Sequence, residues 1–304
     1  MEANILYFED FEFPLDRPVN FYLVKSATLS VMVDLGTSKS LSKLLASGLK
    51  LDMAILTHYH LDHSGGLVAL ARHNREVRVC ASRATIEILY NTKLVEERML
   101  LIAKALGLSA LPLPEGAFEF FRNKYVEISE AAKSVGLEEP EDCLSKIGGE
   151  YMECPGHSID HICILFKGHF FIGDNIVGGP NVTLLDVNKY FESMIRALSR
   201  RDYEVVHPGH GPPNMSASEA SAVFLETFKA KRRRLARVLS SIASKDGWVG
   251  LDEVYERVYK SLNDPLKGWV AARSLIGYLN SLEEDGIIEV NRAESPWRVR
   301  LKTE

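Results

Sequence analysis

The residues with the clearest chemical potential lie in one short loop, Thr57-His58-Tyr59-His60-Leu61-Asp62-His63. Three of the nine histidines of the protein fall in this segment, together with an aspartate. Neutral imidazoles and carboxylates are ligands that zinc and related divalent metals use in proteins. A lone histidine is more often an ordinary surface or core residue, but three of them around an aspartate predict a metal site.

Polar residues with similar chemistry follow other apolar segments of the sequence. The loop above comes directly after Met53–Leu56, which predicts a buried strand. Three more candidates stand in equivalent positions: His157 after Glu150–Cys154, Asp174 after Phe170–Gly173, and His210 after Glu204–Val206. Each of them alone could be a turn or capping residue. Together they predict four strand-end loops that meet at one edge of a sandwich.

The chain of 304 residues is long enough for one large domain or two unequal ones. Residues 83–147 interrupt the strand pattern with helical spacing and predict a helical insertion, which is either a lid over the site or plain scaffold. The segment 111–114, with two prolines, is expected to break these helices. The other expected elements are strands at Asn4–Phe8, Asn20–Val24, Leu29–Val33, Val77–Ala81 and Ile162–Phe166, and a helix at Ser38–Ser47.

The pattern changes again after Pro213, where we place a domain boundary between residues 1–213 and 214–304. The expected elements are a helix at Ser216–Ser244, helices at Leu251–Leu262 and Val270–Asp285, and a hairpin of Ile287–Val290 with Trp297–Leu301. Three helices followed by a β-hairpin are the layout of a winged helix. Gly286 is expected to end the last helix.

The ordered motifs resemble those of the metallo-β-lactamase superfamily over about residues 1–213. They are an early aspartate (Asp34), T-H-x-H-x-D-H at 57–63, P-G-H-S at 155–158, G-D at 173–174 and G-H-G at 209–211. The resemblance implies an α+β fold, an αββα sandwich, with two divalent metal ions, zinc or else iron or manganese. It also implies that His58, His60 and His157 hold one metal, that Asp62, His63 and His210 hold the other, and that Asp174 bridges them.

The same resemblance implies roles for residues around the ligands. Asp62 is expected to act in catalysis by orienting the attacking hydroxide. Asp34 is expected to hydrogen-bond a ligand histidine, although it could equally be a turn residue before Gly36. His161, the second histidine of P-G-H-x-x-x-H, is expected to support the site from behind the ligands, and neither it nor His207 is expected to bind metal.

The implied activity is that of a hydrolase. A water shared by two cations loses its proton near neutral pH and can attack an ester-type bond. Members of the family that hydrolyse antibiotics often have a cysteine at the bridging position, so Asp174 argues against a specialised β-lactamase. Members with a C-terminal winged helix include endoribonucleases, and this favours a phosphodiester substrate such as single-stranded RNA. The basic run 229–234 could contact phosphates or simply be a solvated helix face.

Two alternatives remain open at this stage. The first is a small-molecule hydrolase of thioesters, lactones or carboxylesters. The second is a regulator whose winged helix binds nucleic acid and whose metal domain senses a ligand. Duplex DNA binding is not expected, because Arg273 is the single basic group of the third C-terminal helix. A winged helix could also serve as a dimerisation module, and so a homodimer is possible.

Composition limits the class of protein. The formal net charge is −5, and the start of the chain is acidic and lacks the basic segment of a signal peptide. No apolar run approaches the ~18–20 residues that span a membrane, so we expect a cytoplasmic protein. The four cysteines do not suggest a disulfide framework. The sequence contains no glutamine, a thermolabile residue, which hints at a thermophilic source.

Overall fold

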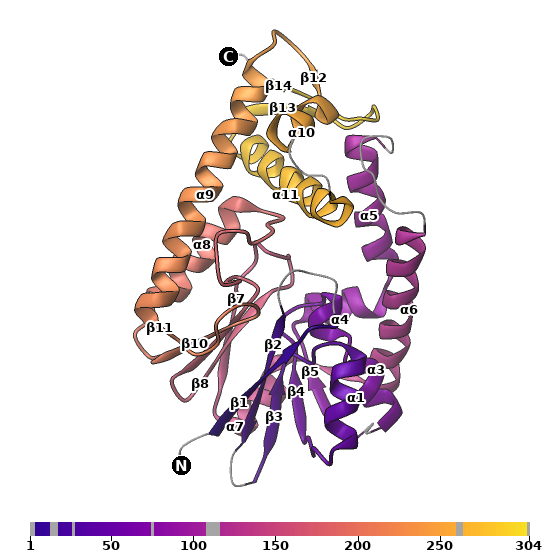
Figure 1. Cartoon of the computed structure of the whole chain (residues 1–304), viewed down its shortest axis with the longest axis vertical. Helices are drawn as coiled ribbons and strands as arrows, with labels where there is room; N and C mark the ends of the chain where they lie inside the picture. The colour runs from indigo at the N-terminus through magenta and orange to yellow at the C-terminus, as the bar shows by residue number, and fades with distance from the viewer. Residues whose placement is uncertain are drawn as a thin grey trace.

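The computed structural model describes residues 4–12, 18–25, 28–73, 76–107, 116–259 and 264–302. Two β-sheets face each other, and helices cover both outer faces (Figure 1). The predicted two-sheet sandwich with helices on both sides is therefore confirmed. No helix among the described residues is both long and apolar enough to cross a bilayer.

The first sheet has six strands in chain order. They are β1 (Asn4–Asp10), β2 (Val19–Lys25), β3 (Ser30–Val33), β4 (Met53–Ile55), β5 (Arg78–Cys80) and β6 (Leu137–Glu138). The second sheet has the order β11 (Met215–Ser216), β10 (Val205–Pro208), β9 (His169–Gly173), β8 (Ile162–Phe166) and β7 (Glu150–Glu153). The strands β3 to β6 run parallel, as do β9 and β10, so that the loops after β4, β9 and β10 can carry neighbouring side chains.

Alternating side chains build the core between the sheets. Tyr22 and Val24 of β2 point inward and pack in one cluster with Ile164 of β8. The intervening Phe21 and Leu23 point to the opposite face of the first sheet, where helices cover them. This period of two is what a strand buried on both faces requires.

Helices from the first half of the chain surround the first sheet: most cover its outer face, whereas the end of the fifth packs with the C-terminal elements and the seventh packs into the cluster between the two sheets. They are α1 (Ser38–Ala46), α2 (Leu61–Ser64), α3 (Leu67–His73), α4 (Arg83–Tyr90), α5 (Lys93–Leu106), α6 (Ala117–Val135) and α7 (Pro140–Ile147). The last four lie in the predicted helical insertion, together with the short strand β6, which was not predicted. The expected break at 111–114 falls outside the described residues.

The second sheet is covered by α8 (Val187–Leu198) and by the C-terminal elements. These are α9 (Ala217–Ala243), β12 (Val249–Gly250), α10 (Leu251–Tyr259), α11 (Pro265–Glu284), β13 (Ile288–Asn291) and β14 (Arg298–Leu301). Ser216 caps α9 in a capping box with Glu219. The helices and the hairpin were predicted, while β11, β12 and α8 were not. The assignment of this region as a winged helix, and the boundary at 213, stay predictions.

The helix α11 begins five residues before its predicted start, at Pro265. The carboxylate of Asp264 accepts hydrogen bonds from the backbone N–H groups of Leu266 and Lys267, which caps the helix before its first apolar residues. Figure 1 shows α11 crossing the molecule between α9 and α5. The hydroxyl of Ser281 accepts a hydrogen bond from the backbone of Val187, so that α11 docks on α8 instead of projecting into solvent.

The four cysteines were not expected to form a disulfide framework, and the structure has one disulfide among them. Cys80 at the end of β5 and Cys143 in α7 form a disulfide across 63 residues of sequence. The bridge links the helical insertion to the first sheet. The spacing of the cysteines along the sequence does not reveal this pairing. Cys154 and Cys163 are free and buried.

Candidate metal centre

The loop after β4 and the short helix α2 present the first four candidate ligands. His58 and His60 lie in the loop, and Asp62 and His63 lie in α2. All four side chains are buried or nearly so. The turn after α2 is tight, because a Cβ atom on Gly66 would lie 2.5 Å from the carbonyl oxygen of Leu35. Glycine at this position therefore lets the chain pass close to the site.

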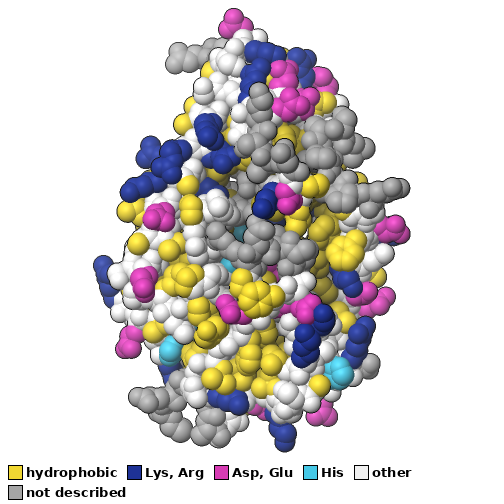
Figure 2. Space-filling model, viewed as in Figure 1, with side chains coloured by type: hydrophobic (Ala, Val, Ile, Leu, Met, Phe, Trp, Pro, Cys, Tyr) yellow, Lys and Arg dark blue, Asp and Glu magenta, His cyan; other side chains and the backbone are white. Residues whose placement is uncertain are grey.

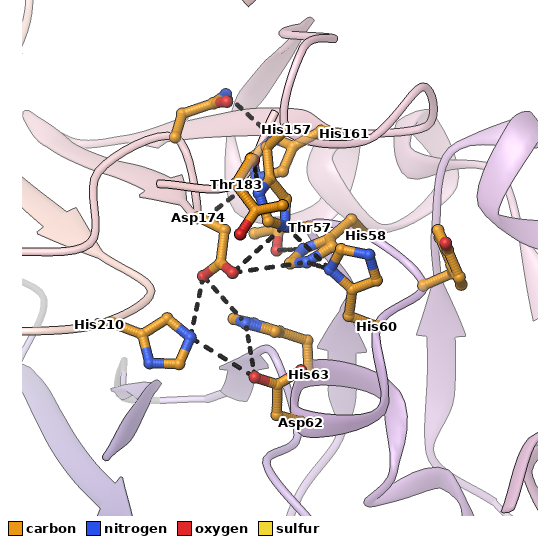
Figure 3. Close-up of polar contacts among 12 residues, drawn as sticks. Thr57, His58, His60, Asp62, His63, His157, His161, Asp174, Thr183 and His210 are labelled. Carbon is orange, nitrogen blue, oxygen red and sulfur yellow. Dashed lines mark hydrogen bonds and ion pairs between the residues drawn. The ribbon is translucent and has the colours of Figure 1, made fainter. Parts of the chain in front are cut away.

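The other three candidates reach the same point from the second sheet. His157 lies in the loop between β7 and β8, Asp174 follows β9, and His210 follows β10. Figure 3 shows the seven side chains converging on one small volume. They form two groups, and within each group the potential ligand atoms all lie within 4.8 Å of one another. The first group contains His58, His60, His157 and Asp174, and the second contains Asp62, His63 and His210.

Asp174 lies between the two groups. Its Oδ2 atom is 3.3 Å from Nε2 of His157, and its Oδ1 atom is 3.1 Å from Nε2 of His63 and 3.3 Å from Nε2 of His210. In the first group, Nδ1 of His60 lies 2.8 Å from Nε2 of His58 and 2.9 Å from Nε2 of His157. One carboxylate therefore contacts both groups, the position that a bridging ligand needs.

The donor set fits two divalent cations. Imidazole nitrogens and carboxylate oxygens crowd together with few hydrogen-bond donors between them, an arrangement that zinc-like ions stabilise. Nε2 of His63 and Oδ1 of Asp174 are buried and lack a hydrogen-bond partner among the described residues, although they face each other. Buried polar atoms without a partner are costly, and a cation between them would remove that cost.

The charges of the site respond strongly to burial. Burial lowers the pKa of His58 and His60 well below the usual value, so both imidazoles stay neutral. Burial alone would raise the pKa of Asp174, but the neighbouring His210 and His63 hold it well below its usual range. Burial also opposes protonation of His210, yet the carboxylates of Asp174 and Asp62 outweigh it and raise the pKa of His210 to about 10.

These shifts predict a pH dependence for the metal-free protein. The pKa of His210 is about 10 in the folded state and about 6.5 when unfolded. Its contribution to stability is therefore complete below about pH 6.5 and is lost as the pH rises through about 10. We expect the free energy of unfolding of EDTA-treated protein to fall over this window, by at most about 1.4 kcal/mol per pH unit for one proton.

Urea unfolding at several pH values measures this slope, and His210→Asn is the matched variant. The variant lacks the titrating imidazole and should lose less stability across the window. A flat profile in the unsubstituted metal-free protein, or an equal slope in the variant, would contradict the prediction.

Polar groups behind the ligands hold their orientation. Oδ2 of Asp34 lies 2.8 Å from Nδ1 of His63, and Oδ1 accepts a hydrogen bond from the backbone N–H of Thr57. Asp34 adopts a positive φ of 58°, as a residue in a tight turn can, so it is a turn residue and a partner of a ligand histidine at once. Nε2 of His161 accepts from the backbone N–H of Asp174 at 3.2 Å. His207 lies apart and pairs with His169 at 3.0 Å.

A cavity of about 600 Å³ opens beside the first group. The insertion helices α5 and α6 form one wall, and α11 forms another. Figure 2 shows histidine side chains in a hollow near the middle of this face. Sequence reasoning missed three side chains of this cavity, Arg98, Tyr125 and Arg273. No local pattern marks them, because they reach the site only through the packing of distant helices.

The model of the metallo-β-lactamase superfamily matches residues 14–210, well over half of the chain. This protein belongs to the metallo-β-lactamase superfamily. Its members are generally hydrolases, and the two His/Asp groups described above are the candidate dinuclear site. The identity of the metal stays a prediction.

Similar members of this superfamily come from fungi and bacteria. The lactamase-like protein nscB of Aspergillus fumigatus is 22% identical over 88% of this chain and 73% of its own length. The thioesterase pkgB of Emericella nidulans is 21% identical over 75% of this chain, which spans 57% of that protein. A crystal structure of a metallo-β-lactamase family protein from Thermus thermophilus has a TM-score of 0.67 at 19% identity and covers 98% of both chains. At this identity, the structural likeness shows the fold.

Proposed function

We propose that this protein is a dinuclear metal-dependent hydrolase of small-molecule acyl thioesters. The observation that carries the proposal is the cavity beside the two His/Asp groups. Its lining is mainly apolar and includes Val95, Met99, Ile102, Phe121, Trp269, Val270 and Ile276. Concave apolar walls with a few polar groups at one end are typical of sites for small organic ligands. The relative pkgB is named a thioesterase, which agrees with this class of substrate.

The chain would hold one cation with His58, His60, His157 and Asp174, and the other with Asp62, His63, His210 and the second oxygen of Asp174. Two such cations supply Lewis acidity and lower the pKa of a bound water toward neutrality. The apolar wall from α5, α6 and α11 would hold the acyl group and exclude bulk water. The carboxylate of Asp62 lies at the edge of this cavity and would orient the attacking water.

A phosphodiester substrate has less support. Single-stranded nucleic acid needs a basic groove with exposed aromatic platforms, whereas α11 packs its apolar residues into the core. Part of the basic run of α9 is structural: the ammonium of Lys231 is buried and donates to the carbonyl of Val182, and Arg234 stacks over Tyr259 at 4.5 Å. Figure 2 shows the remaining Lys and Arg along the outer flank of α9, away from the central hollow.

The test compares substrates in one preparation of zinc-loaded protein. Hydrolysis of hexanoyl-N-acetylcysteamine is measured by the thiol that it releases. Phosphodiester cleavage is measured with an end-labelled single-stranded RNA. We expect thiol release and intact RNA. RNA cleavage without thiol release would overturn the proposal and restore the phosphodiester hypothesis.

A further inference from the structure

In each candidate ligand histidine, one ring nitrogen points away from the other candidate ligands, and the partner of this nitrogen differs in His60. A metal-bound histidine normally donates its other ring N–H to a carboxylate, a carbonyl or water. In four of the five candidate histidines this nitrogen faces a hydroxyl, carboxylate or carbonyl oxygen. These oxygens are Thr57 Oγ1 at 3.0 Å for His58, Asp34 Oδ2 at 2.8 Å for His63, the Thr183 carbonyl at 2.7 Å for His157, and the Pro18 carbonyl at 2.9 Å for His210. The fifth, His60, has a cation.

Arg273 of α11 supplies that cation. Its Nη2 atom lies 2.8 Å from Nε2 of His60 and 3.3 Å from the carbonyl oxygen of His157. Nδ1 of His60 faces the other ligands. When this nitrogen binds metal, the neutral ring carries its hydrogen on Nε2. Two hydrogen-bond donors then lie side by side at the cavity, and a single acceptor oxygen that contacts both from the cavity would satisfy them.

A second guanidinium group lies at the same end of the cavity. Arg98 of α5 has its Cζ atom 5.7 Å from the ring centre of Tyr59, which in turn lies 4.7 Å from the ring of His60. The Nη1 atom of Arg98 is buried and has no hydrogen-bond partner among the described residues. Arg98 and Arg273 therefore approach the Tyr59–His60 segment from the insertion and from the C-terminal region, respectively.

Neither arginine has an acidic partner within the part of the chain that the structure describes. The ion pairs of that part include Lys189, which also lines the cavity and lies 3.4 Å from Asp186, but neither Arg98 nor Arg273. Both arginines are half-buried, and a cation that is partly withdrawn from water is stabilised when an anion accompanies it. The planar fork of a guanidinium group matches the two oxygens of a carboxylate.

We propose that Arg273 and Arg98 bind a carboxylate on the acyl group of the substrate. The inference rests on the thioesterase function proposed above and makes its preferred substrate the monothioester of a dicarboxylic acid. Arg273 contacts the side of His60 that faces away from the other ligands. The carboxylate therefore lies apart from the reacting carbonyl, and the two arginines position the substrate without taking part in bond cleavage.

Matched substrates test the preference. Succinyl, glutaryl and adipyl thioesters of N-acetylcysteamine are compared with butanoyl, pentanoyl and hexanoyl thioesters, which have the same chain lengths without the carboxylate. Charge-assisted hydrogen bonds to a carboxylate are about twice as strong as hydrogen bonds between neutral groups. We therefore expect kcat/KM to favour the best carboxylated substrate by about 10- to 100-fold.

Three variants locate the effect. Arg273→Met and Arg98→Met should reduce the preference to a few-fold, mainly through KM, while Arg273→Lys retains part of it. Lys189→Met removes the paired cation of the same cavity and should keep the full ratio. Zinc content and circular dichroism of each variant show whether the fold and the ligands are intact.

Direct binding separates this inference from the proposed function. Calorimetric titration of the zinc-loaded protein with glutarate or adipate should show binding that Arg273→Met weakens. Hydrolysis of both substrate series at equal efficiency, without Arg273-dependent binding, would overturn the carboxylate site and leave the thioesterase proposal standing. Arg273-dependent binding without any thioester hydrolysis would overturn the thioesterase proposal and leave the carboxylate site standing. An arginine-dependent preference for coenzyme A thioesters over N-acetylcysteamine thioesters, whatever the acyl group, would overturn the carboxylate in favour of a phosphate on the thiol carrier.

Discussion

Replacing His58 with alanine should lower the rate of hydrolysis by on the order of a thousandfold or more. Nε2 of His58 lies 2.8 Å from Nδ1 of His60 and is fully buried, so that no other side chain can take its place. Loss of this nitrogen removes one ligand from the group that Asp174 shares with its neighbour. We expect the variant to hold less than one full equivalent of metal in this group.

The measurement combines metal analysis after dialysis with steady-state rates on a thioester substrate. His73→Ala is the matched control, because His73 is exposed at the end of α3 and belongs to neither candidate group. The control should keep both its metal content and its rate. A His58→Ala protein that keeps the unsubstituted rate with verified metal content would contradict the assignment of the site.

Gly209→Ala should disable the site without replacing any of the candidate ligands. A Cβ atom on Gly209 would lie 2.2 Å from Oδ1 of Asp174, far inside contact distance. The backbone of Gly209 cannot move away easily, because its N–H donates to the carbonyl of Gly173 at 2.8 Å and its carbonyl accepts from Asn20 at 2.7 Å. The same Cβ atom would also lie 2.9 Å from the carbonyl carbon of Gly173 and 3.0 Å from the backbone nitrogen of Asp174. The backbone of Asp174 and its carboxylate must therefore shift away from the two groups of histidines.

We expect the Gly209→Ala protein to lose about 10- to 100-fold in metal affinity, the range seen when the orientation of a ligand is disturbed, and to lose activity with it. Competition with a chelator measures the affinity. Gly48→Ala is the control: a Cβ atom there has no neighbour within 4 Å, although the φ angle is +92°. It should reduce stability by roughly 1 kcal/mol and leave metal binding unchanged. Equal metal affinity in Gly209→Ala and unsubstituted protein would show that Asp174 tolerates the displacement.

The C-terminal region contributes directly to the cavity beside the candidate metal site. A Cβ atom on Gly277 of α11 would lie 2.3 Å from the carbonyl oxygen of Leu184, which shows how closely this helix packs on the loop before α8. The same helix brings Arg273 to the ligands and Trp269 to the cavity wall. The C-terminal elements therefore form part of the wall of the cavity beside the two His/Asp groups.

Local sequence was enough to single out the candidate ligands and the layers of the fold. The segment 57–63 carries four candidate ligands within seven positions, so no tertiary information is needed to find them. His157, Asp174 and His210 follow apolar strands, and strands that share a sheet direction bring such loop residues to one edge. Alternation of inward and outward side chains in β2 likewise follows from local periodicity. The helix α8 was missed although Asp186 caps it and its buried positions 187, 190, 194 and 197 recur at helical spacing.

Packing between distant elements, in contrast, selects the side chains that complete the site. His60 and Arg273 are 213 residues apart in the sequence, and their contact depends on how α11 docks beside α5 and α8. The pairing of Cys80 with Cys143 and the burial of Lys231 inside a run of basic residues depend on packing in the same way. Local patterns report the periodicity of one element, whereas substrate specificity arises where the surfaces of several elements meet, and packing free energy alone sets that geometry.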